Sequence, residues 1–338
     1  MGKKNKKNCA NFAAVKPYEY KGIKNQTVFP EFVELCKKTQ NELIDILPQR
    51  LRDAGYTDVI CEDGFIYARG NIPYLVTAHM DTVHLSVVQD FYEYVDENGR
   101  HILSSPQGIG GDDRCGIYMI LEIIKEFKPY VLFCEDEESG MIGAKKFVRT
   151  KYIDEFDSDI DFMIELDRAH ANDAVFYDCD NPEFTAYILE NTKYEKDFGT
   201  FSDISTLAPM CGVAGVNLSC GYYKPHTLQE EVVVEEMLNT IVVVKRLLSS
   251  KSVKYEYIEK EYLGYAGGWG YDWSGCDGFW SANDVHEYIL YVAFSTLQGT
   301  EGFDTVTGYT EEQAWLDFFQ KNPNTCWNDV LDYYVDRI

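Results

Sequence analysis

The fold is decided by a short apolar run that ends in a histidine, YLVTAH at residues 74–79, with Met80 and Asp81 directly after it. A run of this length and composition is typical of a β-strand. An imidazole at the end of a strand makes a good zinc ligand when its second nitrogen donates to a carboxylate, and Asp81 supplies a carboxylate two residues on. The alternative for His79, taken alone, is a surface histidine that pairs with an acid.

Helix and strand patterns alternate on both sides of this run. Residues 29–54 carry apolar side chains at helical spacing and predict an amphipathic first helix. The remaining patterns predict strands at 59–61, 65–68, 130–133, 162–166 and 212–218, and helices at 116–127, from 143, at 201–208 and at 229–249. We therefore expect an α/β fold with a mostly parallel or mixed central sheet flanked by helices, in which reactive groups gather at the carboxyl ends of strands.

The composition changes after about residue 250, since all five tryptophans lie beyond it. We divide the chain into an N-terminal tail at 1–28, a main domain at 29–250 and a C-terminal extension at 251–338. Helix-like patterns in the extension lie near 283–297, 311–320 and 326–337, so we expect a small helical piece rich in aromatic residues. It either buries its aromatic side chains on the main domain or serves as a lid, a dimer surface or a docking site for another protein.

The formal charge of −25 argues against two classes of partner, nucleic acid and anionic membrane surfaces. No apolar run reaches the roughly 18 residues that a membrane span needs, and the basic N-terminus lacks the apolar core of a signal peptide. The ten cysteines are scattered without a C-x-x-C pair, which indicates neither a zinc ribbon nor a disulfide framework. We expect a cytoplasmic protein with reduced thiols.

A glycine-rich segment, GIGGDDRCG at residues 108–116, opens one of the predicted helices. Glycine lets the backbone approach closely, as a carboxylate shared by two cations about 3.5–4 Å apart requires. Asp112 is the candidate for that shared carboxylate. The alternative is that Asp112 or Asp113 caps the helix.

Four acids in the segment EDEESG, residues 135–140, follow a predicted buried strand. Carboxylates this close repel one another unless cations compensate them. Adjacent glutamates at a strand-to-helix turn can divide two tasks, one coordinating a metal while the other accepts a proton from the attacking water. The alternative is a solvated acidic run.

Two further segments complete the candidate set. ELD at residues 165–167 closes an apolar strand, and PHT at residues 225–227 lies in a loop before the last predicted helix. Either segment could be incidental, and four other histidines compete on chemical grounds: His84, His101, His170 and His286.

The conjunction of these residues carries more weight than any one of them. Two imidazoles and three carboxylates at successive strand ends offer each of two zinc ions a mixed nitrogen and oxygen ligand set with Asp112 shared: His79, Asp112, Glu138, Asp167 and His226. The charge also balances, because three carboxylates and one hydroxide offset the charge of two Zn²⁺ ions. A nearly neutral site of this kind can be buried at low cost.

The ordered motifs HMDTV, GGDDRCG, EDEESG, ELD and PHT resemble the zinc exopeptidase superfamily, which includes peptidase T, carboxypeptidase G and the leucyl aminopeptidases. The resemblance covers about residues 29–250 and implies that they form a di-zinc peptidase catalytic domain. It also implies the roles: one metal held by His79 and Asp167, the other by Glu138 and His226, Asp112 between them, Asp81 orienting His79, and Glu137 as general base.

One departure from the family bears on function. Relatives such as peptidase T carry an inserted lid or dimerisation domain before the last histidine, whereas only 58 residues separate Asp167 from His226. The compact core favours an aminopeptidase. The alternatives are a deacylase of N-acyl amino acids that uses the same site, and a non-catalytic binding or structural protein that keeps the fold.

The expected ligands follow from this reading. The cofactor is two Zn²⁺ ions, for which Co²⁺ or Mn²⁺ could substitute. The substrate is a peptide or an N-acyl amino acid, and a second copy of the chain or another protein could bind the tryptophan-rich C-terminal segment. Nucleic acid and membranes are not expected partners.

Overall fold

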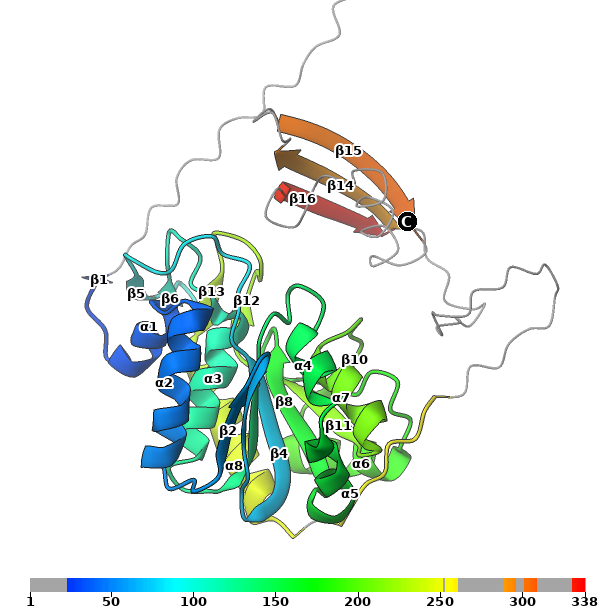
Figure 1. Cartoon of the computed structure of the whole chain (residues 1–338). Helices are drawn as coiled ribbons and strands as arrows, with labels where there is room; N and C mark the ends of the chain where they lie inside the picture. The colour runs from blue at the N-terminus through cyan, green and yellow to red at the C-terminus, as the bar shows by residue number, and fades with distance from the viewer. Residues whose placement is uncertain (1–22, 252, 261–287, 296–300, 309–329, 338) are drawn as a thin grey trace, which may run out of the picture.

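The computed structural model describes residues 23–251, 253–260, 288–295, 301–308 and 330–337. The first two ranges hold a mixed eight-stranded sheet with helices on both faces (Figure 1). Its strands, in spatial order, are β10 (Glu195–Asp197), β9 (Asp173–Val175), β11 (Gly215–Ser219), β8 (Phe162–Arg168), β4 (Ile72–His79), β7 (Pro129–Cys134), β3 (Phe65–Ala68) and β2 (Val59–Glu62). This confirms the expected α/β fold with a mixed central sheet.

The four central strands run parallel, because β8 pairs in parallel with both β4 and β11, and β4 pairs in parallel with β7. Strands β2 and β3 form an antiparallel hairpin across the turn at Asp63 and Gly64. Since parallel strands end at one edge of a sheet, the residues that follow β4, β7 and β8 are brought to the same edge.

Both faces of the sheet are buried, and strand β4 shows how. Tyr74, Val76 and Ala78 pack into a cluster with one helical layer, while Leu75 packs into a second cluster on the opposite face. The first layer holds α1 (Pro30–Cys36), α2 (Gln40–Asp53), α3 (Gly111–Ile123), α6 (Pro182–Thr192) and α8 (Val234–Ser249). The second holds α4 (Ile142–Phe147), the 3₁₀ turn at Lys151–Glu155, α5 (Phe156–Asp159) and α7 (Asp203–Cys211).

The expected single helix over 29–54 is wrong, because the chain forms two helices there. Helix α1 ends at Cys36, and α2 starts after Thr39, whose hydroxyl accepts a hydrogen bond from the Glu42 amide at 3.3 Å. The Glu42 carboxylate in turn accepts from the Thr39 amide at 2.9 Å. In this reciprocal capping box, the backbone amide of each residue donates to the side chain of the other. The capping box starts a new helix inside a continuous apolar pattern.

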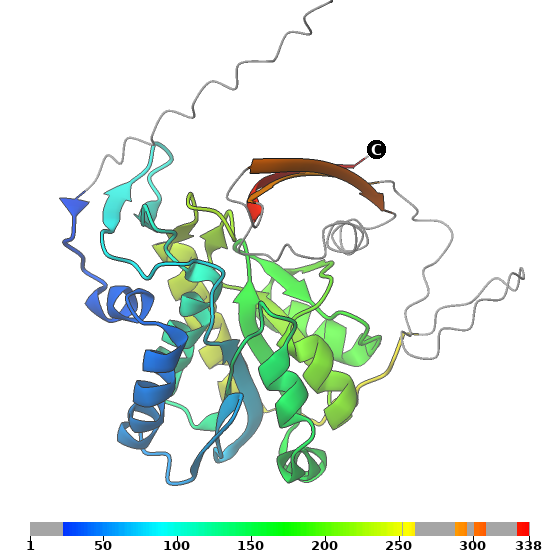
Figure 2. The ribbon, with the colours of Figure 1, turned by 45° about the horizontal axis from the view of Figure 1, so that its top comes forward.

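A second sheet of five strands lies beside the first (Figure 2). Its strands, in spatial order, are β1 (Ile23–Lys24), β5 (Tyr92–Val95), β6 (His101–Ser104), β13 (Glu231–Val233) and β12 (Tyr222–Tyr223). Strands β12 and β13 pair antiparallel, with Tyr222 opposite Val232. The loop between them carries His226, so this hairpin fixes where that imidazole lies.

The C-terminal extension is not helical where the structure describes it. Residues 288–295, 301–308 and 330–337 form the antiparallel strands β14 (Tyr288–Ser295), β15 (Glu301–Gly308) and β16 (Val330–Arg337), with β14 in the middle. The sequences YILYVAFS and VLDYYVDR are rich in β-branched and aromatic residues, whose preference for strands outweighs the weak helical spacing. The expected helix at 311–320 and all five tryptophans lie outside the described residues.

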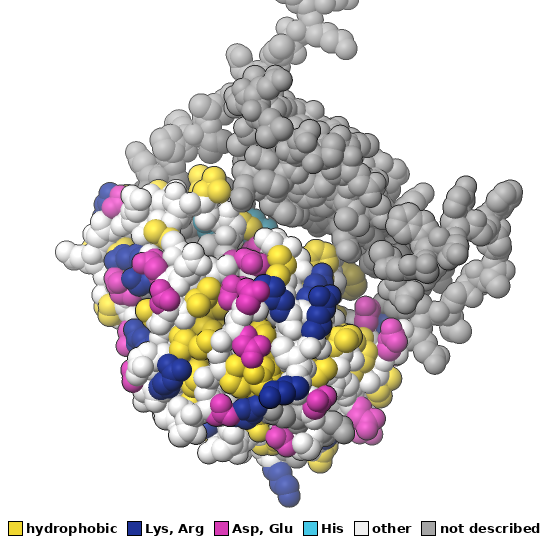
Figure 3. All heavy atoms as spheres, in the orientation of Figure 1, with side chains coloured by type: hydrophobic (Ala, Val, Ile, Leu, Met, Phe, Trp, Pro, Cys, Tyr) yellow, Lys and Arg dark blue, Asp and Glu magenta, His cyan; other side chains and the backbone are white. Residues whose placement is uncertain are grey.

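Among the described residues, no helix combines the length and the apolar character that a bilayer crossing requires. On the face of the main domain shown in Figure 3, acidic side chains are interspersed with lysine and arginine side chains. The large negative charge is therefore not gathered into one acidic patch on that face.

Candidate metal centre

The sequence-predicted site residues converge at the carboxyl edge of the central sheet. His79 is the last residue of β4, Asp167 lies near the end of β8, and Glu138 follows β7. Asp112 lies in the first turn of α3, and His226 comes from the β12–β13 loop. Segments up to 147 residues apart in sequence are thus brought to one place by strand ends, a helix start and a hairpin.

The first group of three candidate ligands is His79, Asp112 and Asp167, of which His79 and Asp112 are buried and Asp167 is partly buried. The Nε2 atom of His79 lies 2.9 Å from Oδ1 of Asp112 and 3.4 Å from Oδ1 of Asp167. Its other nitrogen, Nδ1, lies 3.1 Å from Oδ1 of Asp81. Both ring nitrogens of His79 therefore face carboxylates.

The second group shares Asp112 with the first. The Nε2 atom of His226 lies 3.2 Å from Oδ2 of Asp112 and 3.1 Å from Oε1 of Glu138. One carboxylate oxygen of Asp112 thus faces His79, and the other faces His226. Within each group, the candidate ligand atoms lie within 4.8 Å of one another.

These spacings fit metal ligands. Ligands at about 2.0–2.2 Å from a tetrahedral zinc ion lie about 3.3–3.6 Å from one another, close to the distances within both groups. In the described part of the chain, Oε1 of Glu138 is buried and accepts no hydrogen bond. It lies 3.1 Å from Nε2 of His226, which is itself a candidate ligand, so a cation between the two atoms would give this buried oxygen a partner.

The electrostatics also suit a cation. Although burial acts to lower it, the pKa of His79 is held well above its usual range by Asp167 and Asp112. Burial and the charge of Asp112 raise the pKa of Asp167 to about 6. Protons therefore compete for the same atoms that would hold a metal, as expected where several carboxylates lack a permanent positive charge.

Asp81 connects the histidine to the glutamate pair. Its Oδ1 accepts a hydrogen bond from the Glu137 amide at 2.9 Å, and its Oδ2 accepts from the Glu138 amide at 3.0 Å. Burial acts to raise the pKa of Asp81, but the contact with His79 and these two hydrogen bonds hold that pKa below its usual range. Asp81 therefore stays ionised and fixes the ring of His79 relative to both glutamates.

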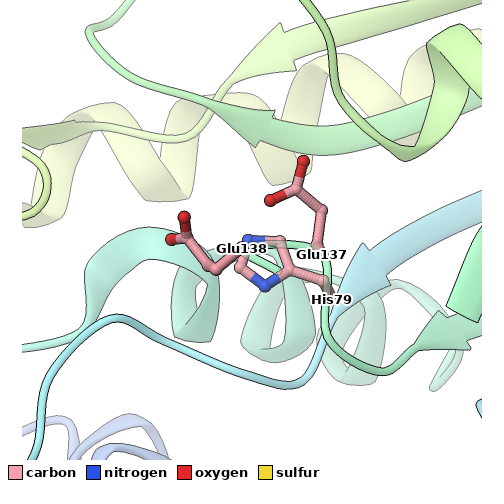
Figure 4. Close-up of side chains that lie close together, drawn as sticks. All are labelled: His79, Glu137 and Glu138. Carbon is pink, nitrogen blue, oxygen red and sulfur yellow. The ribbon is translucent and has the colours of Figure 1, made fainter. Parts of the chain in front are cut away.

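Glu137 lies beside the two metal-ligand groups. One of its carboxylate oxygens, one of Glu138 and a ring nitrogen of His79 lie within 4.8 Å of one another (Figure 4). Burial raises the pKa of Glu137 well above its usual range, and the charges of Asp167 and Glu138 add to that effect while His79 opposes it. A carboxylate with a raised pKa suits proton transfer.

The two aspartates of the glycine-rich segment have different partners. Oδ1 of Asp113 accepts a hydrogen bond from the Gly116 amide at 2.8 Å, and its Oδ2 accepts from the His79 amide at 3.2 Å. Asp113 thus makes the helix-capping contact that was the alternative for this segment, while Asp112 faces the histidines.

Sequence reasoning missed several side chains that support Asp167. Ser202 donates to Oδ2 of Asp167 at 2.9 Å, the Tyr222 hydroxyl donates to its carbonyl oxygen at 2.9 Å, and Oδ1 of Asn217 accepts from its amide at 3.0 Å. The buried carboxylate of Glu165 accepts from the Ile204 amide at 3.3 Å. No motif in the sequence analysis marks Ser202, Asn217 or Tyr222, because single polar side chains on strands and helix starts are common, and Glu165 was given no role although it opens the ELD segment.

The competing histidines have other partners. Nε2 of His84 lies 2.7 Å from Glu230, and Nε2 of His101 lies 2.7 Å from Glu93. His170 is exposed, and His286 lies outside the described residues. None of the first three joins the two groups around Asp112.

Known proteins are similar to the main domain in sequence pattern and in fold. Residues 68–201 match the family model of peptidase family M28. A search of curated proteins gave no match. The fold is similar to that of a tripeptidase from Staphylococcus aureus, with a TM-score of 0.51 and 16% identity over 65% of this chain and 96% of that chain.

Two other solved structures are similar at lower TM-scores. The aminopeptidase PepT from Bacillus cereus has a TM-score of 0.48 and 16% identity, over 65% of this chain and 96% of that one. The TET1 peptidase from Pyrococcus horikoshii has a TM-score of 0.48 and 13% identity, over 65% of this chain and 99% of that one.

Proposed function

We propose that this chain is a co-catalytic di-zinc aminopeptidase, because residues 68–201 match the model of peptidase family M28 and the fold brings two groups of metal-ligand side chains together. The observation that carries this proposal is the position of Asp112, whose two oxygens face His79 and His226 at 2.9 and 3.2 Å. A single carboxylate placed between two imidazoles is the arrangement that a pair of metal ions needs.

Five side chains divide the work of holding the ions. His79 and Asp167 would hold one zinc, Glu138 and His226 would hold the other, and Asp112 would contact both. When bound, the two ions polarise the scissile carbonyl and lower the pKa of the attacking water. Ser202 and Tyr222 keep Asp167 in place, and Asp81 keeps the ring of His79 in place.

Glu137 would transfer the proton. It takes a proton from the attacking water at its carboxylate and delivers it to the amine of the leaving peptide. Two features support this role: the amide of Glu137 donates to Asp81, which fixes its backbone, and its carboxylate lies within 4.8 Å of His79 and Glu138, beside the metal-ligand groups.

The compact core supports the proposed substrate class. All residues from Asp167 to His226 are described, and they form β9, α6, β10, α7, β11 and β12 of the two sheets and their helical layers without an inserted domain. The edge of the sheet that carries the site is therefore not reached through a lid inserted at that point of the chain. This supports hydrolysis of the N-terminal residue of peptides, as in aminopeptidases, rather than a lid-dependent reaction.

A substrate panel tests the proposal. The zinc-loaded full chain is expected to hydrolyse aminoacyl anilides and short peptides with a free N-terminus. The matched controls are the same peptides with an acetylated N-terminus and N-acetyl amino acids. Faster turnover of the acetylated compounds would overturn the aminopeptidase assignment in favour of a deacylase that uses the same site.

A further inference from the structure

Glu230 is a fully buried carboxylate four residues after His226, and no role in the site has been assigned to it so far. Its Oε2 accepts a hydrogen bond from the Gly110 amide at 2.8 Å, and its Oε1 accepts from the Asp112 amide at 2.9 Å. Its Oε2 also lies 2.7 Å from Nε2 of His84. Three groups from two separate segments thus converge on one carboxylate.

Glu230 binds the backbone from Gly110 to Asp112, the segment that carries the Asp112 carboxylate. Gly110 has a φ of 66°, a left-handed conformation that favours glycine, directly before helix α3. A Cβ atom on Gly111 would lie 3.3 Å from Oε1 of Glu230 and 2.8 Å from Cβ of Tyr222, so the backbone is pressed close against the β12–β13 hairpin. The carboxylate therefore fixes both the position and the direction of the first turn of α3.

His84 completes this arrangement. Its ring packs against the backbone of Gly108, where an added Cβ would lie 2.1 Å from the ring. An ionised carboxylate is costly to bury, and here two backbone amides and an imidazole offset that cost. The same contacts join the segment after β4, the start of α3 and the loop that carries His226.

We propose that Glu230 is a positioning residue of the metal centre, which orients Asp112 so that one carboxylate oxygen faces each metal position. This inference rests on the proposed function, because it concerns the same two ions. Glu230 lies in the same β12–β13 loop as His226, directly before strand β13. The position of this loop therefore sets the distance between the Asp112 carboxylate and His226.

The test compares zinc binding by the full-length wild type, Glu230→Gln and Glu231→Gln, measured by competition with a chromophoric zinc chelator. Glutamine keeps one acceptor but turns an NH₂ group towards a backbone amide, so Glu230→Gln is expected to bind zinc about 10- to 100-fold more weakly, as for other supports of metal ligands. Glu231→Gln, which weakens the ion pair with the exposed Lys224 and touches no metal ligand, is expected to stay within about 3-fold of wild type.

A second readout separates positioning from loss of fold. The Co²⁺-loaded Glu230→Gln protein is expected to show an altered visible absorption spectrum, while far-ultraviolet circular dichroism matches wild type. If Glu230→Gln does not fold, Glu230→Asp decides in the same assays, because its shorter side chain keeps the charge but cannot reach both amides.

Each outcome has a separate meaning. Weaker zinc binding and an altered cobalt spectrum in a folded variant support the inference. Wild-type affinity and spectrum in a folded Glu230 variant overturn it and leave the proposed function intact. A wild-type protein that binds no zinc overturns the proposed function itself, and the inference falls with it.

Discussion

Asp112 and Glu137 both lie beside His79, and the proposed function gives them different chemical tasks. Asp112 faces two imidazoles, whereas the Glu137 carboxylate lies beside the ligand groups and has a raised pKa. Substitution at the two positions therefore separates metal binding from proton transfer.

Glu137→Gln is expected to keep both zinc ions and to lose at least a few hundred-fold in kcat, because the amide cannot accept the proton of the attacking water. The measurement is kcat on an aminoacyl anilide together with elemental analysis of the same sample. Near-normal turnover would remove Glu137 from the role of base.

Asp112→Ala is expected to lose metal rather than turnover alone. Because both groups of three share this carboxylate, the zinc content should fall from two ions per chain towards zero, whereas His226→Ala should remove mainly the ion held with Glu138. Elemental analysis after gel filtration measures both. Two ions retained by Asp112→Ala would show that the carboxylate is not shared.

The sequence singled out the five proposed ligands because histidine and carboxylate side chains are typical of metal sites, and because His79, Glu138 and Asp167 follow apolar runs. Asp81 could be predicted for the same reason. Glu230, Asn217 and Tyr222 could not, since their importance depends on which backbone amide or carboxylate they meet across the fold.

At the scale of elements, the spacing of apolar residues predicted the strongly buried elements correctly. It failed where local hydrogen bonds or side-chain preferences determine where an element begins and which type it is. Strand β4 is apolar on both faces and was readily predicted. The break between α1 and α2 depends on Thr39 and Glu42, whose capping box interrupts an apolar pattern that by itself continues. Strands β14 and β16 were predicted as helices because aromatic-rich segments satisfy both periods over a few residues.

Thr39→Ala is expected to lower the free energy of unfolding by about 1 kcal/mol, because the amide of Glu42 loses its acceptor at the start of α2. Urea unfolding followed by circular dichroism measures the change. Asn41→Ala, at an exposed position in the same turn, is the matched control. Equal stabilities of the two variants would mean that the cap does not stabilise the helix.

At the scale of the whole molecule, the site joins both sheets. The central sheet supplies His79, Asp167 and the glutamate pair, and the five-stranded sheet supplies the hairpin with His226. Sequence alone could not predict that second sheet, because its strands are short and pair across long separations in the chain.

Removal of zinc is therefore expected to destabilise the entire main domain. A ligand that binds only the folded state at about 1,000 times its Kd stabilises that state by about 4 kcal/mol. Chelator-treated protein should melt at a lower temperature than the zinc-loaded protein, and added zinc, but not magnesium, should restore it. Identical melting temperatures with and without zinc would contradict a metal site built between the two sheets.

The most direct test is anomalous scattering from a crystal of the zinc-loaded protein, recorded on both sides of the zinc absorption edge. The account predicts two peaks, one beside His79 and Asp167 and the other beside Glu138 and His226, with Asp112 between them. A single peak, or peaks away from Asp112, would contradict it.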